Sequence, residues 1–473
     1  MNASHEMKTK ALSLIILIGS SNLVHAGKVS SISEFGITWT FDQPSESGQF
    51  ANGDSWVVGP IKIINIDPPS VEKDGRITNG SMLNVSSRLK FRQGFDSSAR
   101  ACAYDASLNV ASGVSKDKPL ALAAGSSLIS TISVDKPKNR PQVKTAAVLT
   151  VLDKPAPAGS FRPPYAGNDK TVRYNIAQLR RDKLLRLKPA GTPPEMAVVE
   201  RHFEQPWIDY VGWDPGDDIH PLDSMPNYSR DFGQQVSEAS LVLLLDMDEA
   251  QKETLLIRMV QLGIDDYGVV VDGGSGFDNW KPGGGESNGR KWPIVFAGLM
   301  LGDDAMMKAQ YPSGEDGNTY YGKCWTGADV CWGMYHSFDP KRDHEEKPPT
   351  EWTFDGRGKP GDPSAGHDSD SRSEGYRRSC TSATWVGEAL AAQLLKMDDA
   401  WNHPAFFDYV DRWMYEDDAK FRLAKWQASG APGDYKAEQF VQGTSRSSFI
   451  DAMWAAYRPT LPRPIDGWKK PKQ

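Results

Sequence analysis

The sequence predicts an α+β multidomain chain, in which an N-terminal antiparallel β-sandwich is followed by an (α/α) toroid of helical hairpins. Two observations carry this prediction. Short alternating or β-branched stretches, separated by Pro, Gly, Asn and Asp, fill residues 28–152. After them a helix–corner–helix pattern recurs, since Val236–Ala250 returns as Val386–Ala400, with a shorter echo at Phe296–Ala305. Such a hairpin cannot bury its apolar face alone, so it must stack on its neighbours.

The N-terminus has the features of a secretory signal peptide. Lys8 and Lys10 precede the apolar run Ala11–Gly19, and a small-residue cleavage pattern ends at Ala26. The apolar run is too short to anchor the chain in a bilayer. We therefore expect a secreted or periplasmic monomer without a membrane span, with residues 1–26 as the signal peptide.

Four cysteines allow two disulfides in an oxidising compartment. Cys324 and Cys331 are close enough in sequence for a local bridge. Cys102 and Cys380 lie in different halves of the chain, and either a bridge between the halves or a pair of buried thiols fits them. The spacing matches no zinc pattern.

Residues 27–153 are expected to form the β-sandwich domain. Its strands are predicted from alternation and β-branched content at Phe35–Phe41, Trp56–Ile66, Leu120–Val134 and Val143–Leu152. Short strands with turn residues between them, and without a helical period, are typical of an antiparallel sandwich.

A Pro-rich linker, residues 154–170, separates this domain from the rest, because Pro stiffens the chain and excludes a helix. Residues 172–187 fit a basic amphipathic helix. Residues 171–473 then form the expected toroid domain, with its hairpins near 232–271, from 291 onward and at 381–415. Hairpins in series fit either an open solenoid or a closed ring, and in a closed ring the loops before the inner helices gather at one mouth.

The loops before the three hairpins hold the residues that we expect to carry chemistry, together with the pair Tyr335-His336. The candidate catalytic residues are His220, Asn227, His336 and Tyr376. The candidate substrate-binding residues are Trp213, Tyr228, Arg230, Asn288, Arg290, Lys291, Arg377 and Arg378.

This set of Asn, His, Tyr and Arg suits β-elimination on a uronic-acid polysaccharide. Removal of the C5 proton of a uronate requires its carboxylate to be neutralised, which Asn and Arg hydrogen bonds can do. A Tyr or His then takes the proton, and a Tyr can protonate the leaving O4. Tyr376 is followed by Arg377 and Arg378, whose charge favours a phenolate. Arg side chains also bind an acidic substrate in a bidentate manner.

Each of these residues also fits a structural role. His220 and His336 fit hydrogen-bonded structural positions, Arg290 fits a helix start, and Asn227 and Asn288 fit turns, where Asn is common.

Other classes of site are poorly matched. Asp368 and Asp370 could hold a structural calcium ion, but the spacing is not that of an EF-hand, and no metal or other cofactor is expected. The Gly-rich segment 273–285 lacks the Lys-Ser/Thr ending of a phosphate-binding loop. A net charge of -7 argues against a nucleic-acid partner.

The combined features resemble bacterial polysaccharide lyases of the alginate, glucuronan and heparinase-like groups. The resemblance covers roughly residues 200–460 and is carried by Asn227-Tyr228-Ser229-Arg230, Asn288-Gly289-Arg290-Lys291, Tyr335-His336 and Tyr376-Arg377-Arg378. It implies an acidic polysaccharide substrate, with Asn neutralising the carboxylate, His and Tyr transferring protons, and Arg binding. The β-module follows the toroid in well-known members, whereas here it comes first.

Two other functions fit the sequence. An (α/α)-barrel glycoside hydrolase would need two carboxylates across a cleft, and Asp214, Asp217 or Asp218 with Glu286 or Glu374 would supply them. A non-catalytic exported carbohydrate-binding protein would use the aromatic residues alone.

Overall fold

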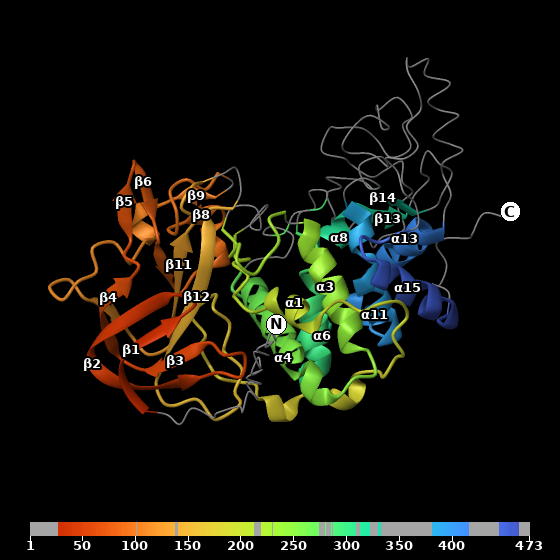
Figure 1. Cartoon of the computed structure of the whole chain (residues 1–473), viewed down its shortest axis with the longest axis horizontal. Helices are drawn as coiled ribbons and strands as arrows, with labels where there is room; N and C mark the ends of the chain where they lie inside the picture. The colour runs from red at the N-terminus through yellow and green to blue at the C-terminus, as the bar shows by residue number, and fades with distance from the viewer. Residues whose placement is uncertain are drawn as a thin grey trace, which may run out of the picture.

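The computed structural model describes residues 27–100, 102–137, 141–211, 219–228, 230–273, 280, 285, 287–308, 313–321, 330–332, 381–415 and 444–462. Figure 1 shows a strand-rich half beside a helix-rich half. The predicted signal peptide and five predicted site residues lie outside the described residues: Trp213, His336, Tyr376, Arg377 and Arg378.

The strand-rich half is built on one eight-stranded sheet. Its order is β10-β4-β2-β3-β12-β11-β7, and β1 pairs with β2 off this path. The strands are β1 Gly27–Glu34, β2 Ile37–Gln49, β3 Ser55–Val58, β4 Ile61–Asp67, β7 Ser81–Leu83, β10 Leu120–Leu122, β11 Ser126–Ser133 and β12 Val143–Leu152. Short two-stranded ribbons flank it: β5 Val71–Lys73 with β6 Arg76–Thr78, and β8 Arg92–Gln93 with β9 Ala103–Tyr104.

The prediction of an antiparallel β-sandwich is therefore wrong. The eight main strands form one curled sheet, and it is mixed, because β3 and β12 pair in parallel. Register shifts in β1, β2 and β11 bend it, since a bulge increases the local twist of a strand. The alternation read from the sequence is the same for one curled sheet as for two packed sheets, so it did not distinguish them.

Two cores lie on opposite faces of this sheet. Leu128, Leu149 and Val151 face a core inside the curl, where Trp39 and Phe41 also lie. Their neighbours Ile129 and Val148 face a larger core shared with the helices. Successive residues of a strand point to opposite faces, so β11 and β12 supply both cores.

The described helices are α1 Met196–Arg201, α3 Arg230–Leu243, α4 Glu249–Val271, α6 Lys291–Leu301, α7 Asp304–Met307, α8 Gly314–Asn318, α11 Val386–Leu394, α12 Asp398–Trp401, α13 Pro404–Tyr415 and α15 Ser448–Tyr457. A small ribbon, β13 Thr319–Tyr321 with β14 Val330–Trp332, lies among them. The recurrent units read from the sequence correspond to α3–α4, α6–α7 and α11–α13. Extensive contacts join α4 to α6 and α3 to α11.

The toroid prediction is also wrong, because the described helices do not form a ring of inner and outer helices. A ring needs two comparable arms in each hairpin. The second arm α7 is only four residues long, whereas α4 has 23. Sheet residues share the main core with the helices, so the curled sheet covers apolar surface that neighbouring hairpins would cover in a toroid.

The segment between the halves is irregular. The predicted helix at 172–187 is replaced by two short 3₁₀ turns, Ile176–Gln178 and Arg181–Lys183. Within this segment the buried Arg162 forms ion pairs with Asp54 beside β3 and with Asp265 of α4, the latter at 2.5 Å. A buried charge is tolerated when it is paired in this way. Arg162 therefore fixes the sheet to the helical half.

Candidate functional site

The start of α3 is a meeting point for side chains from three separate segments. Phe232 is buried there. The Arg290 guanidinium lies 4.7 Å from the centroid of its ring, and the His220 ring meets it edge-on at 5.1 Å between centroids. The ring centroid of Trp207 lies 5.2 Å from that of Phe232. We call His220, Phe232, Asn288 and Arg290 the α3 cluster.

Glycine brings the loop before α6 to this point. Gly289 has a φ of 75°, in the left-handed region that a side chain disfavours. A Cβ at Gly289 would lie 2.9 Å from the Cα of Gly233, so a side chain would separate the loop from α3. Asn288 also lies close to this helix. A Cβ added at Gly233 would lie 3.2 Å from the Cβ of Asn288.

Arg290 is held by a buried ion pair. Its guanidinium donates to Asp209 Oδ1 at 3.0 Å and to the carbonyl of Asn288 at 2.6 Å. Its side chain is 0% exposed and that of Asp209 is 2% exposed. Asp266 of α4 lies within electrostatic reach, and burial, with repulsion from Asp209, raises its pKa well above the usual value. Both effects favour the neutral form of Asp266.

His220 and Asn288 carry buried polar atoms that are not hydrogen-bonded. Among the described residues, neither amide atom of Asn288 has a hydrogen-bond partner. Neither ring nitrogen of His220 meets the geometry of a hydrogen bond, but the carbonyl of Pro226 lies close enough to raise the pKa of the ring. Burial lowers the pKa of His220 to about 3, and the nearby Arg290 acts in the same direction. The imidazole is therefore neutral at physiological pH. Unpaired buried groups are rare in proteins, and one explanation is a ligand that binds them.

A second group of buried charges adjoins the α3 cluster. The carboxylate of Glu315 accepts a hydrogen bond from the Gly289 amide at 2.6 Å. Asp316 accepts from Lys291 at 2.5 Å. Burial, followed by repulsion from Glu315, raises the pKa of Glu388 on α11 well above its usual value. Glu388 and Glu315 can therefore share a proton.

The structure brings together three of the predicted site residues and separates others. His220, Asn288 and Arg290 meet in the α3 cluster, although they come from two different loops. Lys291 is turned to Asp316, away from any open surface, since its side chain is 3% exposed. Asn227 is exposed and therefore does not belong to the buried cluster.

Tyr228 and Arg230 form a pair of their own nearby. The Arg230 guanidinium lies 4.7 Å from the Tyr228 ring centroid, and it donates to Asp231 at 2.7 Å. Both side chains are partly exposed. They remain predicted substrate-binding residues. The other predicted residues lie outside the described ranges: the substrate-binding candidates Trp213, Arg377 and Arg378, the catalytic candidates His336 and Tyr376, the hydrolase carboxylates Asp214, Asp217, Asp218, Glu286 and Glu374, and the possible calcium ligands Asp368 and Asp370.

Sequence reasoning missed the buried carboxyl groups Asp209, Asp266, Glu315 and Glu388. Two of them carried a readable signal. Asp266 interrupts the apolar run of α4, and Glu388 stands among Val, Ala and Leu in α11. An acid within an apolar helical stretch is unusual, because a buried carboxyl group needs a partner or a proton.

The described part of the chain shows no group of three or more His, Cys, Asp and Glu side chains arranged to hold a metal ion. No described helix has the length and apolar character needed to cross a membrane. Cys102 is buried in the main core, and the disulfide pairing remains a prediction because the other cysteine side chains are not described. The chain matches none of the protein-family models, curated proteins or solved structures with which it was compared.

Proposed function

We propose that this chain is an exported lyase that cleaves a uronic-acid-containing polysaccharide by β-elimination at the α3 cluster. One observation carries the proposal: a neutral imidazole and an unbonded amide are buried beside a guanidinium. This is the set of groups that the reaction requires, and the set comes from two of the loops where the sequence placed the chemistry.

The proposed roles follow from charge and hydrogen-bonding capacity. The Asn288 amide donates to the carboxylate of the uronate, and the positive field of Arg290 stabilises the enolate-like charge that develops on it. His220 accepts the C5 proton as the C4–O4 bond breaks and the C4–C5 double bond forms. Tyr376 remains the predicted donor of the proton to the leaving O4.

A purely structural cluster is the competing explanation, because His220, Asn288 and Arg290 are almost wholly buried. The two explanations differ in what a substitution changes. Loss of a structural group lowers the free energy of unfolding, whereas loss of a catalytic group lowers turnover in a folded protein.

The first test follows the unsaturated uronate product by ultraviolet absorbance, with purified protein on alginate, glucuronan and glycosaminoglycans. The lyase proposal expects a steady rise on at least one of these polymers. No rise on any of them, together with new reducing ends on a neutral glycan, would show a hydrolase instead. No product from any glycan would favour a non-catalytic binding protein.

The decisive variant is Asn288→Leu. We expect kcat/KM to fall about 10²–10³-fold, as for loss of one donor to a developing oxyanion. The melting temperature should stay near that of the wild type, because no hydrogen bond to the Asn288 amide group is lost among the described residues. Wild-type turnover in this variant would exclude the role that we assign to Asn288.

Asn109→Leu provides the matched control. Asn109 is also buried, but its side chain accepts from the amides of Ser81 at 3.2 Å and Ala111 at 3.1 Å and donates to Ser70 at 2.8 Å. Its loss leaves these groups unpaired and should lower stability by about 1–3 kcal/mol each while turnover per folded molecule is kept. The two Asn variants should therefore show opposite phenotypes.

A glycoside hydrolase is the second candidate, and the pairing of Glu315 with Glu388 favours it. Two interacting carboxyl groups titrate apart, so one can act as an acid while the other acts as a base. For this candidate, Glu388→Gln should abolish the release of reducing ends from a neutral glycan.

A further inference from the structure

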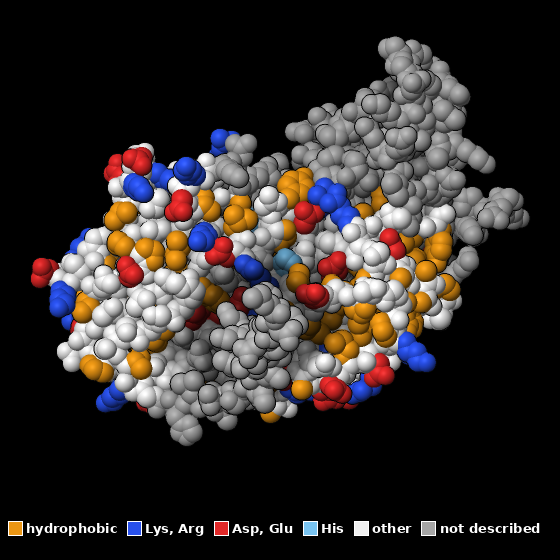
Figure 2. Space-filling view, viewed as in Figure 1, with side chains coloured by type: hydrophobic (Ala, Val, Ile, Leu, Met, Phe, Trp, Pro, Cys, Tyr) orange, Lys and Arg blue, Asp and Glu red, His pale blue; other side chains and the backbone are white. Residues whose placement is uncertain are grey.

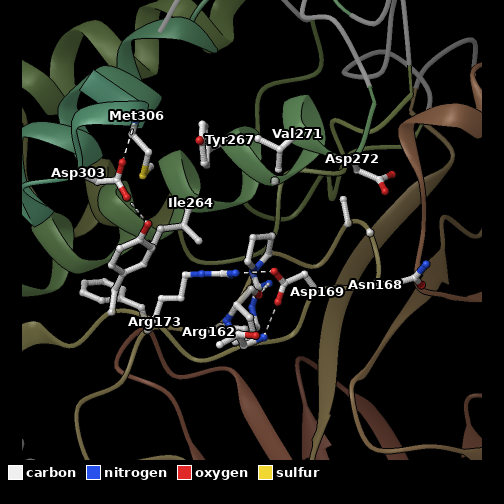
Figure 3. A pocket seen from close by; sticks show the side chains of 18 residues that line it. Arg162, Asn168, Asp169, Arg173, Ile264, Tyr267, Val271, Asp272, Asp303 and Met306 are labelled. Carbon is white, nitrogen blue, oxygen red and sulfur yellow. Dashed lines mark hydrogen bonds and ion pairs between the residues drawn. The ribbon is translucent and has the colours of Figure 1, made fainter. Parts of the chain in front are cut away.

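A cavity of about 470 Å³ lies between the linker segment and the helices α4 and α7 (Figure 3). Its volume falls within the range of pockets that hold small molecules. Asn168, Asp169 and Arg173 line it from the segment that follows β12, and Ile264, Tyr267 and Asp303 line it from the helical half. We call it the linker pocket. It shares no lining residue with the α3 cluster.

The walls of the linker pocket are fixed by hydrogen bonds. Asp303 accepts from the Tyr174 hydroxyl at 2.6 Å and caps α7 through the Met306 amide at 3.0 Å. Asp272 accepts from the hydroxyl of Ser86 at 2.6 Å. Lys170, just behind the wall, donates to the carbonyls of three consecutive residues, Pro164, Tyr165 and Ala166. The cavity is therefore a built feature rather than a gap between loosely packed segments.

Polar groups at its mouth remain available to a ligand. Arg173 and Asp169 form an ion pair at 2.5 Å, with side chains that are 48% and 58% exposed. Figure 3 shows this pair beside Ile264 and Tyr267 of α4. The hydrogen bond to Asp169 uses one guanidinium nitrogen, Nη2, so other N–H groups of Arg173 can donate to a ligand. Asn168, also exposed, adds an amide.

The mouth of the pocket offers hydrogen-bond donors to an acidic or neutral polar ligand. Asp272 and Asp303 already accept hydrogen bonds from neighbouring groups, and Asp169 is neutralised by Arg173. The group left with spare donors is a guanidinium, which matches a carboxylate. The rings of Tyr174 and Tyr267 add amphipathic surface, which suits a sugar ring with an apolar face and a polar edge.

We propose that the linker pocket is a second carbohydrate site, which binds one or two sugar units through a uronate carboxylate held by Arg173. The choice of a uronate rests on the proposed function. The face drawn in Figure 2 supports local recognition of this kind, because Lys and Arg side chains there are interspersed with Asp and Glu and form no continuous basic strip among the described residues.

The test uses isothermal titration calorimetry with a glucuronan trisaccharide, an alginate trisaccharide and neutral cellotriose, in the Asn288→Leu background to prevent cleavage. We expect at least one uronate trisaccharide to bind more tightly than cellotriose. Adding Arg173→Gln should weaken that binding at least tenfold.

Arg186→Gln is the matched control, because Arg186 is similarly exposed and pairs with Asp246 at 3.1 Å away from the pocket. It should leave the affinity unchanged. Equal affinity in the Arg173→Gln protein, or an equal loss in the Arg186→Gln protein, would overturn the proposal.

Different results would refute the proposed sugar site and the proposed lyase function. Uronate binding that depends on Arg173, in a protein that produces no unsaturated product, would leave the pocket standing and remove the lyase. Lyase activity in a protein whose uronate binding does not depend on Arg173 would refute the sugar site and leave the lyase proposal standing. In a protein with both sites, Arg173→Gln should raise KM for the polymer and leave kcat unchanged, since the pocket does not touch the reacting atoms.

Discussion

At the scale of single residues, the helical half is distinguished by polar groups in apolar surroundings. Burial raises the pKa of Asp266 and of Glu388, and it lowers the pKa of His220. In each case the low dielectric favours the neutral form. Arg290 and Asp209, by contrast, are held as an ion pair.

Replacement of Glu388 tests this picture through the pH dependence of stability. Its folded pKa lies above the usual 4.5, so its neutral form stabilises the fold at low pH, and that contribution is lost as the pH rises from 4.5 towards the folded value. Glu388→Gln does not titrate. Its melting temperature should match the wild type near pH 4 and exceed it at pH 8 by roughly 2–4 °C for each kcal/mol of relief.

Asp105→Asn should behave in the opposite way. Hydrogen bonds from Ser107 lower the pKa of Asp105, so its ionised form stabilises the fold at high pH. The variant should lose stability at pH 8 and little at low pH. A parallel shift of both variants across the pH range would contradict the assignment.

The sequence predicted three residues of the α3 cluster but not the buried acids that surround them. Its loops supplied His220, Asn288 and Arg290, because Gly, Asn and polar residues before an apolar helix indicate a loop that can approach another helix. The partners Asp209 and Asp266 were not predictable, since an ion pair between residues 81 positions apart depends on tertiary packing.

At the scale of elements, the repeated segments contact each other at matching positions. Ser237 of the first copy and Gly387 of the second are equivalent in sequence. The Ser237 hydroxyl donates to the Thr384 carbonyl at 2.7 Å and accepts from the Glu388 amide at 3.0 Å. The absence of a side chain at Gly387 lets α3 and α11 approach this closely.

Gly387→Ala should push these two helices apart. The added Cβ would lie 2.6 Å from Ser237 Cβ and 2.8 Å from its carbonyl oxygen, which is backbone and cannot rotate away. We expect a loss of about 1–3 kcal/mol in the free energy of unfolding, typical of overpacking. Urea denaturation measures it, and an unchanged midpoint would show that α3 and α11 are not in contact here.

Single elements were more predictable than their assembly. The predicted strands correspond to β2, β3 with β4, β10 with β11, and β12, and the repeated hairpins correspond to α3–α4 and α11–α13. The helix expected at 172–187 failed because its hydrogen bonds go elsewhere: the Arg180 amide donates to Met300 of α6 at 2.8 Å. Periodicity reports which face is apolar, but not which partner covers it.

At the scale of the whole molecule, the sheet and the helices share one core. Ile129 and Val148 of the sheet belong to the same buried cluster as Phe232 and Val260 of the helices. The Pro-rich linker was expected to divide two domains, yet apolar packing and the Arg162 ion pairs cross it.

This continuity predicts that the sheet and helices unfold together. Native-state hydrogen exchange should give the central amides of β11, β12 and α4 the same opening free energy, equal to that of global unfolding. A clearly lower value for the strands would show that the sheet opens as an independent unit.

The alternation of side chains along β12 provides two positions for spectroscopic probes. Val148 and Leu149 are adjacent in the chain, yet one side chain faces the core shared with the helices and the other faces the core inside the curl. A fluorine label on either residue would therefore sense a different environment at almost the same backbone position. Two such probes could separate a disturbance that enters from the helical half from one confined to the sheet.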